Sequence, residues 1–454
     1  MTEIPDSVKY KFSPQLLAEI AVAGTPVKVI IQVAAGTVSL ASATIASLGG
    51  RVEWQSELTN QISLTIDDGQ LAALASLGSI LQLFHVPRGE LLIHRGVPHA
   101  GILPLPQALV ATGVTLEETT NYIGAPRLWD RGFRGQGVKV GIVDTGVDKD
   151  HPMLDQVVVA ERDFTGSGLA DTVGHGTWVA SAIAGREWLS PLGLMIGVAP
   201  EATIVSAKAF NTDNADLDVI MQALEWVALQ DCHVLSNSWG GEDYPPLLEL
   251  VRVILRRGQV IVGAIGNAGP SAGTVRFPGG WPEVIGVGSI ATIAPAPDAV
   301  ASFSSRGPAP NGVLKPDLVA PGGSEEECVE GAAPGGGTAC FRGTSMAAPH
   351  VSGAIALLLS NGEKPIPRVR GIGVAWPDNN SGYGVLSFAP GAVPIPVNGP
   401  AAGFDFAPVV GIGFLVLVLL FFISPVTNRR PEPAAAPTDV IQENVDRIIE
   451  RLRR

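Results

Sequence analysis

The segment VKVGIVDTGVD, at residues 138–148, opens the part of the chain that decides the fold. Its first half is an almost uninterrupted apolar run, which is typical of a β-strand buried on both faces. Similar runs follow at residues 203–210, 233–240, 259–267 and 283–290. Helical hydrophobic patterns lie between several of them, as in LDVIMQALEWVALQ and LLELVRVILRR. This alternation predicts an α/β domain with a mostly parallel sheet and helices on both faces.

Three polar residues stand at the ends of these predicted elements. Asp144 ends the first strand, and the carboxyl ends of strands form the functional crevice of an open α/β sheet. His175 lies in GHGTWVASAIAG, where a helix of small residues begins, and Ser345 lies in GTSMAAPHVSG, at the head of an apolar helix. Pro349 is expected to be tolerated there because it would fall in the first turn.

Together these residue types suit nucleophilic catalysis. A serine hydroxyl needs an adjacent base, and an imidazole can take its proton while a carboxylate fixes the imidazole's tautomer and stabilises its cation. The helix N-terminus at Ser345 would supply backbone N–H groups and a positive dipole end to a developing oxyanion. Asn267, which follows the run VGAIG, can add a side-chain N–H. Each residue alone is more often a cap or turn residue, so the prediction rests on the set.

The order of the motifs gives this set a family resemblance. VDTGVD, GHGTWVA and GTSMAAPHVSG resemble the subtilisin-like serine proteases, as do GVAP, SNSWGG, GNAGP, FSSRGP and KPDLVAPGG between them. The likeness implies a seven-stranded, mostly parallel sheet and serine endopeptidase activity on protein or peptide substrates, with no required cofactor. It also implies that Asp144, His175 and Ser345 form the catalytic triad. Asn267 would then line the oxyanion hole.

The same resemblance assigns residues to substrate binding. An extended peptide that lies along an exposed strand edge is a common mode of recognition. One set of residues matches the strand against which family substrates lie, and another matches the wall of the pocket for the side chain before the cut bond. The first set is Ser238, Trp239 and Gly240, and the second is Ala264, Ile265 and Gly266.

Three positions depart from the family pattern, and one of them is Trp178, where a second His is common. Trp239 is bulkier than the usual Leu, so it is expected to narrow the neighbouring subsite and to disfavour large side chains there. Met153 stands where many members have an Asp that binds calcium. The position therefore lacks that calcium ligand; the resemblance leaves a structural calcium ion possible, and no residue is assigned as a metal ligand.

Residues 27–87 predict a small separate domain. Their patterns follow the order strand, helix, strand, strand, helix, strand, which is a compact two-layer α+β unit of the βαββαβ type. By element order and position it resembles the family's propeptide, a folding aid and intramolecular inhibitor, preceded by an extension at residues 1–26. The resemblance implies that the last strand, SILQLFHV, leads a tail into the active-site cleft, with self-processing between Val86 and Thr120, and residues 88–121 are predicted to be a linker. The catalytic domain is expected at residues 122–363.

Composition and missing motifs exclude other classes. The chain has 43 acidic and 30 basic side chains, a formal charge of −13, and no Lys/Arg cluster in its first 400 residues, so nucleic acid is not an expected partner. No HExxH zinc motif is present. A G-x-S-x-G nucleophile elbow of esterases is excluded because Ala347 stands where its second Gly would be.

The three cysteines cannot build a disulfide scaffold. Cys328 and Cys340 flank a Gly-rich loop and can pair if that loop faces an oxidising compartment; two unpaired thiols are the alternative. Cys232 lies between a helical pattern and an apolar run, so it is expected to be a buried small hydrophobe.

The C-terminal region predicts attachment to a lipid bilayer. Residues 364–405 are the Pro-rich end of the catalytic domain and a linker, and residues 406–424 hold a long uncharged run that predicts one transmembrane helix. Arg429 and Arg430 favour a cytoplasmic C-terminus and an extracytoplasmic catalytic domain. A tail-anchored protein with a cytoplasmic protease is the alternative, because no export signal is visible at the N-terminus.

The tail at residues 425–454 ends in an amphipathic helical pattern. Such a helix can pair with a second copy or lie on the membrane surface, and a solvated cap is the alternative. The leading hypothesis for the whole chain is a self-processing, membrane-tethered serine endopeptidase. Its alternative is a non-catalytic or permanently inhibited subtilisin-like binding module, which the four filled catalytic positions disfavour.

Overall fold

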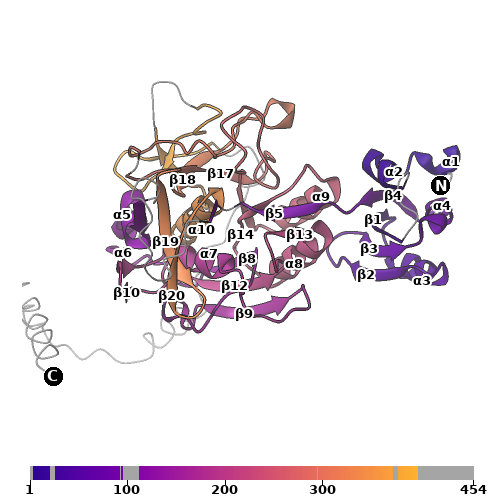
Figure 1. The fold of residues 1–454 in the computed structure, drawn as a ribbon, viewed down its shortest axis with the longest axis horizontal. Helices are drawn as coiled ribbons and strands as arrows, with labels where there is room; N and C mark the ends of the chain where they lie inside the picture. Colours follow the sequence, from indigo (N-terminus) through magenta and orange to yellow (C-terminus); the bar gives the residue numbers. More distant parts are fainter. Residues whose placement is uncertain are drawn as a thin grey trace, which may run out of the picture. The chain divides into compact units, whose positions relative to one another are not determined.

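A ten-stranded sheet lies at the centre of the catalytic region, in the order β23-β21-β22-β18-β17-β16-β14-β8-β12-β9 (Figure 1). The computed structural model describes residues 4–20, 26–92, 94–95, 112–293, 295–371 and 377–396. Every pairing from β22 to β9 is parallel, as the apolar runs predict. The long strands are β8 (Lys139–Asp144), β9 (Val158–Asp163), β12 (Thr203–Lys208), β14 (Val234–Asn237), β16 (Val260–Ala264), β17 (Ile285–Ile290) and β18 (Leu318–Pro321).

Helices cover both faces of this sheet. Helices α7 (His175–Ala184) and α10 (Thr344–Ser360) pack on one face, and α8 (Leu217–Leu229) and α9 (Pro245–Arg256) pack on the other. Successive side chains of a strand point to opposite faces. Accordingly Ile142 of β8 belongs to the core cluster of α7 and α10, whereas Val143 belongs to that of α8 and α9.

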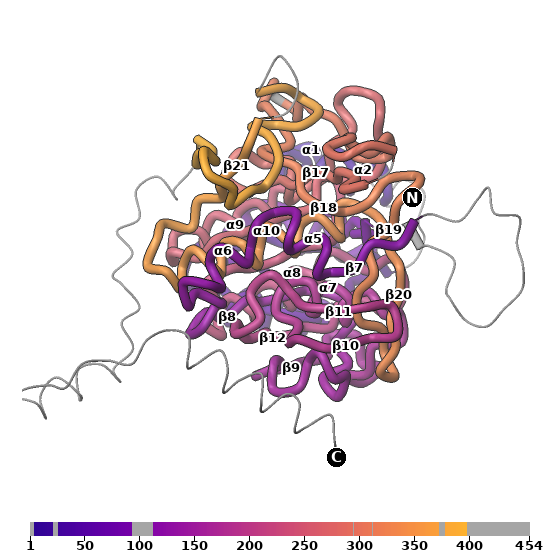
Figure 2. Tube along the Cα trace, turned by 90° about the vertical axis from the view of Figure 1, so that its left-hand side faces the viewer, coloured from indigo at the N-terminus to yellow at the C-terminus, as the bar shows by residue number. Residues whose placement is uncertain are grey.

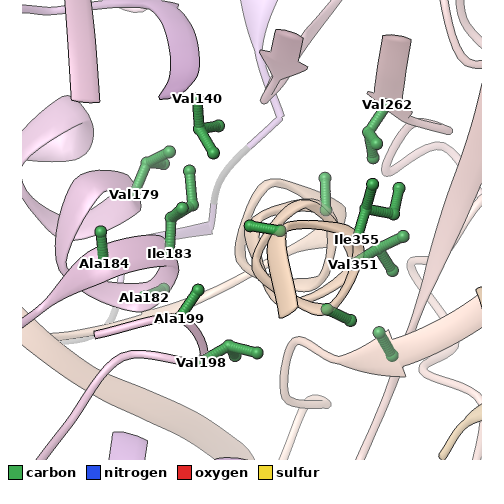
Figure 3. Packing of buried hydrophobic residues seen from close by; sticks show 14 of the residues in the cluster. Val140, Val179, Ala182, Ile183, Ala184, Val198, Ala199, Val262, Val351 and Ile355 are labelled. Carbon is green, nitrogen blue, oxygen red and sulfur yellow. The ribbon is translucent and has the colours of Figure 1, made fainter. Parts of the chain in front are cut away.

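Helix α10 runs through the middle of the molecule, and its residues from Thr344 to Leu358 are all buried. A helix that is apolar on every side must be enclosed by other elements. Figure 3 shows Val351 and Ile355 of α10 near Val262 of the sheet, with Ile183 of α7 to the other side of the helix. The enclosure fixes the position of the helix N-terminus, where Ser345 lies.

An antiparallel four-stranded sheet, in the order β2-β3-β1-β4, forms the N-terminal domain (Figure 1). The βαββαβ order that the sequence predicts is present. Its elements are β1 (Val27–Val33), α3 (Val38–Ser47), β2 (Arg51–Gln55), β3 (Gln61–Ile66), a 3-10 turn (Asp68–Gln70), α4 (Leu71–Ser76) and β4 (Ile80–His85). Two helices come from the predicted extension and pack on this domain's core: α1 (Asp6–Lys9) buries Val8, and α2 (Pro14–Ile20) buries Leu16 and Ile20.

The sheet of the catalytic region has more strands than the seven that were predicted. The additional ones come from the stretch predicted to be a Pro-rich end and linker. They are β21 (Arg368–Arg370), β22 (Val385–Leu386) and β23 (Val393–Pro394), which extend the sheet beside β18. Strands of two or three residues leave no periodic pattern, so only their pairing with the sheet reveals them.

The predicted linker at residues 88–121 also contains regular structure. It forms β5 (Arg88–Leu91), β6 (His94–Arg95), β7 (Thr112–Thr115) and the start of α5 (Leu116–Ile123). Each strand pairs with a strand of the catalytic region rather than with its own neighbours in sequence. A capping box between Thr115 and Glu118 begins α5. The remaining short elements are α6 (Pro126–Trp129), β10 (Trp188–Ser190), β11 (Gly193–Met195), β13 (Asn214–Asp216), β15 (Trp239–Gly240) and 3-10 turns at Pro152–Leu154 and Pro310–Gly312.

A disulfide joins Cys328 and Cys340 across the hairpin of β19 (Glu327–Ala333) and β20 (Gly337–Arg342), whose two strands lie at the right-hand side of Figure 2. Of the two alternatives left open by the sequence, the structure therefore contains the paired one. Cys232 is buried, as predicted. Within the described ranges no helix is both long and apolar enough to cross a membrane. The predicted transmembrane helix at residues 406–424 and the amphipathic tail at residues 425–454 lie outside the described residues.

Candidate active site

Asp144 and His175 form a buried pair at the carboxyl end of the parallel sheet. Asp144 is the last residue of β8, His175 is the first residue of α7, and Oδ1 of the carboxylate lies 2.7 Å from Nδ1 of the imidazole. Both side chains are almost fully buried. Gly176 makes the approach feasible, because a Cβ atom at this position would lie 2.1 Å from the carbonyl oxygen of Gly146 and 3.1 Å from the Asp144 side chain.

Ser345 is the second residue of α10, and its hydroxyl does not bond to the imidazole in this structure. The Ser345 hydroxyl donates to the carbonyl oxygen of Ser238 over 2.6 Å. Nε2 of His175 is buried and has no hydrogen-bond partner among the described residues. Leaving a buried nitrogen unpaired costs about 1–3 kcal/mol. A hydrogen bond from a new partner to Nε2 would therefore stabilise this site.

Pro349 lies in the second turn of α10, not in the first turn as expected from the sequence. Because proline has no N–H, it cannot bond to the carbonyl oxygen of Ser345 four residues earlier. The hydroxyl of Ser238 takes this place and donates to that carbonyl oxygen over 2.9 Å. Ser238 therefore bonds to Ser345 twice, once through its own hydroxyl and once through its carbonyl oxygen.

Asn267 follows β16 and points its amide group towards the N-terminus of α10. Its Oδ1 accepts hydrogen bonds from the backbone N–H and the hydroxyl of Thr344, at 3.0 and 2.9 Å. An N–H donor requires the amide oxygen opposite it, so this contact fixes which way the amide is turned. Nδ2 of Asn267 is buried without a partner among the described residues. One N–H donor is thus available beside the backbone N–H of Ser345.

The three residues predicted to form the pocket wall lie at and just after the end of β16. A Cβ atom at Gly266 would lie 2.9 Å from the side chain of Arg276, and a Cβ atom at Gly240, of the predicted substrate strand, would lie 2.8 Å from the same side chain. Ala264 belongs to the main core cluster. The side chain of Ile265 packs away from this wall in a small cluster with Val275 and Ala309, so only its backbone can line the pocket.

The chain's own strand β5 lies between β13 and β15, where the tail that follows the last strand of the N-terminal domain is expected, although its strand structure was not predicted. The three strands form one antiparallel sheet in the order β13-β5-β15. Trp239 of β15 pairs with Leu91, and Gly240 pairs with Glu90. Ser238, Trp239 and Gly240, the strand predicted to bind substrate, therefore bond to residues 90–92 here. Since RGELL has neither alternation nor a turn signal, only its position after the N-terminal domain pointed to it.

Two further residues of the sequence motifs, His350 and Met153, are fully buried. His350 of the Ser345 motif is buried, bonds to the carbonyl oxygen of Met346 and the hydroxyl of Thr119, and burial lowers its pKa to about 4. Met153 is fully buried in the main core cluster. The described ranges contain no group of three or more acidic, His or Cys side chains placed to hold a metal ion.

Comparisons with known proteins agree with the motifs and the fold. The model of the subtilase family matches residues 135–376. The major intracellular serine protease of Bacillus subtilis (strain 168) is 34% identical over 265 residues, which are 56% of this chain and 78% of that protein. The membrane-bound transcription factor site-1 protease of Homo sapiens is 34% identical over 246 residues, 52% of this chain but only 22% of that protein.

Among solved structures, the crystal structure of fervidolysin from Fervidobacterium pennivorans, a keratinolytic enzyme related to subtilisin, matches with a TM-score of 0.62. It is 24% identical in sequence, and the match covers 80% of this chain and 60% of fervidolysin, so it supports the fold. The family model covers more than half of the chain. The motifs of the chain that resemble the family lie within the matched residues, at the sheet positions described above. The chain therefore belongs to the subtilase family of serine endopeptidases.

Proposed function

We propose that this enzyme cuts peptide bonds through an acyl-enzyme formed on Ser345, with His175 as general base and Asp144 as the group that orients it. The observation that carries the proposal is the buried Asp144–His175 pair, whose free Nε2 faces no competing partner among the described residues. A carboxylate on Nδ1 holds the proton there and leaves Nε2 able to accept one. The same carboxylate stabilises the imidazolium that forms when the serine proton is transferred.

The remaining groups suit the charge that develops during attack. Ser345 must first turn its hydroxyl from the Ser238 carbonyl oxygen to Nε2 of His175. Its oxygen then adds to the substrate carbonyl carbon, and the oxyanion is met by the backbone N–H of Ser345 and Nδ2 of Asn267. Such donors are effective because they are already oriented before the charge forms. His175 returns the proton to the leaving amine, and water then releases the acyl group by the reverse sequence.

We also propose that the N-terminal domain inhibits the enzyme until the chain is cut. The domain is held by two buried carboxylates of α8. Glu225 accepts hydrogen bonds from the Ser56 hydroxyl, the Leu58 N–H and the Trp54 indole N–H, at 2.5, 2.6 and 3.2 Å. Asp218 accepts one from the Ser63 hydroxyl at 2.7 Å and lies 2.7 Å from Nζ of Lys28.

Replacing Glu225 with Ala is expected to weaken inhibition by the separate N-terminal domain by about 10-fold or more, because three donors lose their acceptor and hydrogen bonds to a charged group contribute about 1.5–3 kcal/mol. The measurement is the inhibition constant of the purified domain against the processed enzyme. Glu187→Ala, on the exposed surface, is the matched control. An unchanged constant for Glu225→Ala would contradict the proposed role of this contact.

Finally, we propose that residues 406–424 tether the protease to a membrane, with the catalytic domain outside the cytoplasm. The support is the uncharged run followed by Arg429 and Arg430. One relative is named an intracellular protease, and the name of another refers to a membrane-bound transcription factor, so the names do not decide the orientation of this chain. The full chain is expected to stay with the membrane after carbonate washing and to be degraded when intact cells are treated with an external protease. A catalytic domain protected under that treatment would reverse the orientation.

A further inference from the structure

The hairpin of β19 and β20 connects the elements that carry the three proposed catalytic groups. Its second strand leads to α10, and Ser345 lies three residues after the end of β20. The disulfide between Cys328 and Cys340 turns residues 328–340 of the hairpin into a closed loop. The hairpin's contacts with the other two catalytic elements are made by residues inside this closed loop.

The closed loop is bonded to the helix that begins with His175. The indole N–H of Trp178, about one turn further along α7, donates to the Val329 carbonyl oxygen over 3.1 Å. The hydroxyl of Ser181, another turn along, accepts from the Ala332 N–H over 3.0 Å. Residues three apart lie on one side of a helix, so the two bonds fix the rotation of α7 against the hairpin.

Gly331 lets the Trp178 ring lie directly against the closed loop. A Cβ atom at Gly331 would lie 2.5 Å from Nε1 of the indole and 2.6 and 2.7 Å from two of its ring carbons. The Trp178 side chain is fully buried, and protein interiors are packed without free space. A displacement of β19 is therefore expected to move α7 as well, together with His175 at its first position.

The tip of the closed loop reaches the start of α7 and the segment that follows Asp144. Pro334 lies against Gly174, the residue before His175, where a Cβ atom would be 3.4 Å from the proline ring. The Gly335 N–H donates to Oδ2 of Asp148 over 2.8 Å. The closed loop thus contacts the elements of the proposed base and of its carboxylate, and it leads into the element of the nucleophile.

The cross-link is what restricts the conformation of this loop. Four of its thirteen residues are glycines, whose backbone samples more conformations than that of any other residue. A disulfide removes conformations that the open chain would otherwise sample. Cys328 and Cys340 are only 5% and 8% exposed, so a solution reductant has little access to the bond in the folded enzyme. The redox state is therefore set while the chain folds.

We propose that the Cys328–Cys340 disulfide is an oxidative switch for catalysis, and that Trp178 is the positioning residue through which the closed loop holds His175 in line with Ser345. The inference rests on the proposed catalytic function. The two thiols are oxidised by an external disulfide such as glutathione disulfide. The protein gives up two electrons and two protons, its S–S bond forms, and the oxidant is split into two thiols.

This switch links activity to the compartment. Disulfides persist outside the cytoplasm and are rare in reducing compartments. A chain that folds under reducing conditions lacks the cross-link, and its catalytic groups are then held less precisely. A displacement of about 1 Å in an active site can lower the rate about 100-fold. The protease is thus expected to be folded but slow before export and fully active after it.

The first test compares two redox states of the full chain in detergent. The chain is unfolded and reduced, refolded in either dithiothreitol or glutathione disulfide, and processed by a trace of tagged enzyme that is then removed. We expect kcat on casein to be about 100-fold lower in the reduced form and KM to change little, because β13 and β15 lie outside the closed loop. The double variant Cys328→Ala/Cys340→Ala should show the low kcat in both buffers. Cys232→Ala, which removes the free cysteine, should respond to the buffers as the wild type does.

A second test leaves the disulfide in place. Replacing Gly331 with Ala forces the Trp178 ring away from β19 and is expected to lower kcat by about 10-fold or more at a similar KM. Gly337→Ala is the matched control in the same loop, because a Cβ atom there meets nothing within 4 Å and the carbonyl group is unchanged. Trp178→Phe, which loses the indole N–H, should also lower kcat. Its control is Trp129→Phe, which loses an indole bond to the Val198 carbonyl oxygen of the same kind.

The outcomes separate this inference from the proposed function. Casein hydrolysis with equal kcat in both redox states would overturn the switch and leave the protease intact. A raised KM at unchanged kcat would overturn it too, because the loop would then act on substrate binding. A far-ultraviolet circular dichroism spectrum checks the fold of each form, and a reduced chain that fails to fold would show that the bond serves folding instead of positioning. A wild type that cleaves no casein in either state would overturn the proposed function.

Discussion

Replacing Ser345 with Ala is expected to leave the chain at full length and to lower the rate of casein hydrolysis by about 10⁶-fold, the size of the loss measured when the nucleophile of a family member is removed. The reason is that, among the described residues that carry a hydroxyl group, Ser345 alone donates its backbone N–H to the carbonyl oxygen of Leu92. The measurements are the intact mass of the purified protein and the initial rate on casein.

Ser360→Ala is the matched control, because Ser360 lies at the other end of α10 and its hydroxyl donates to the Leu357 carbonyl oxygen. This variant should be processed and active. If the wild-type and Ser345→Ala proteins both stayed uncut and neither cleaved casein, the permanently inhibited module would become the better description. Processing of the Ser345→Ala chain by itself would show that another residue is the nucleophile.

Replacing Asp144 with Asn is expected to reduce kcat by about 10⁴-fold and to change KM little, as in other serine proteases with this triad. The present Oδ1 of Asp144 faces Nδ1 of His175 at 2.7 Å. The Thr145 N–H donates to the same oxygen over 2.8 Å. An Asn that keeps its amide oxygen there loses the negative charge that stabilises the imidazolium, and an Asn that turns its amide nitrogen towards Nδ1 forces the imidazole proton onto Nε2, where it blocks transfer from Ser345.

The two kinetic constants distinguish this explanation from loss of the fold. Asp144 touches no residue of β5, so binding of a peptide should survive its replacement. Asp155→Asn, at an exposed position, is the control and should keep both constants. A raised KM with an unchanged kcat would argue that Asp144 positions substrate instead of the imidazole.

The sequence predicted the elements that carry the catalytic groups because each has a strong local signal. The strand that ends at Asp144, the helix that begins at His175 and the helix that begins near Ser345 are long and apolar, and all three occur where expected. The N-terminal domain was also predictable, since its alternating strands and short helices have clear boundaries. The prediction of Asn267 next to the Ser345 helix agrees with the amide contact to Thr344.

What the sequence did not predict depends on contacts between distant segments. Strand β5 is a strand only because β13 and β15 offer their edges to it. Strands β21 to β23 likewise form only against β18, which is why a Pro-rich stretch seemed to lie outside the sheet. The sequence contains no signal for the orientation of the Ser345 hydroxyl towards the Ser238 carbonyl oxygen, because the hydroxyl can form a hydrogen bond either there or with Nε2 of His175.

The double contact of Ser238 with Ser345 has a consequence for the peptides that the enzyme can accept. The carbonyl oxygen of Ser238 accepts hydrogen bonds from the Leu92 N–H and from the Ser345 hydroxyl. A peptide with proline or an N-methylated residue immediately before the cut has no such proton to give. Chain segments of this kind would be poorly anchored beside the nucleophile, and proteins could resist digestion by presenting them at otherwise accessible loops.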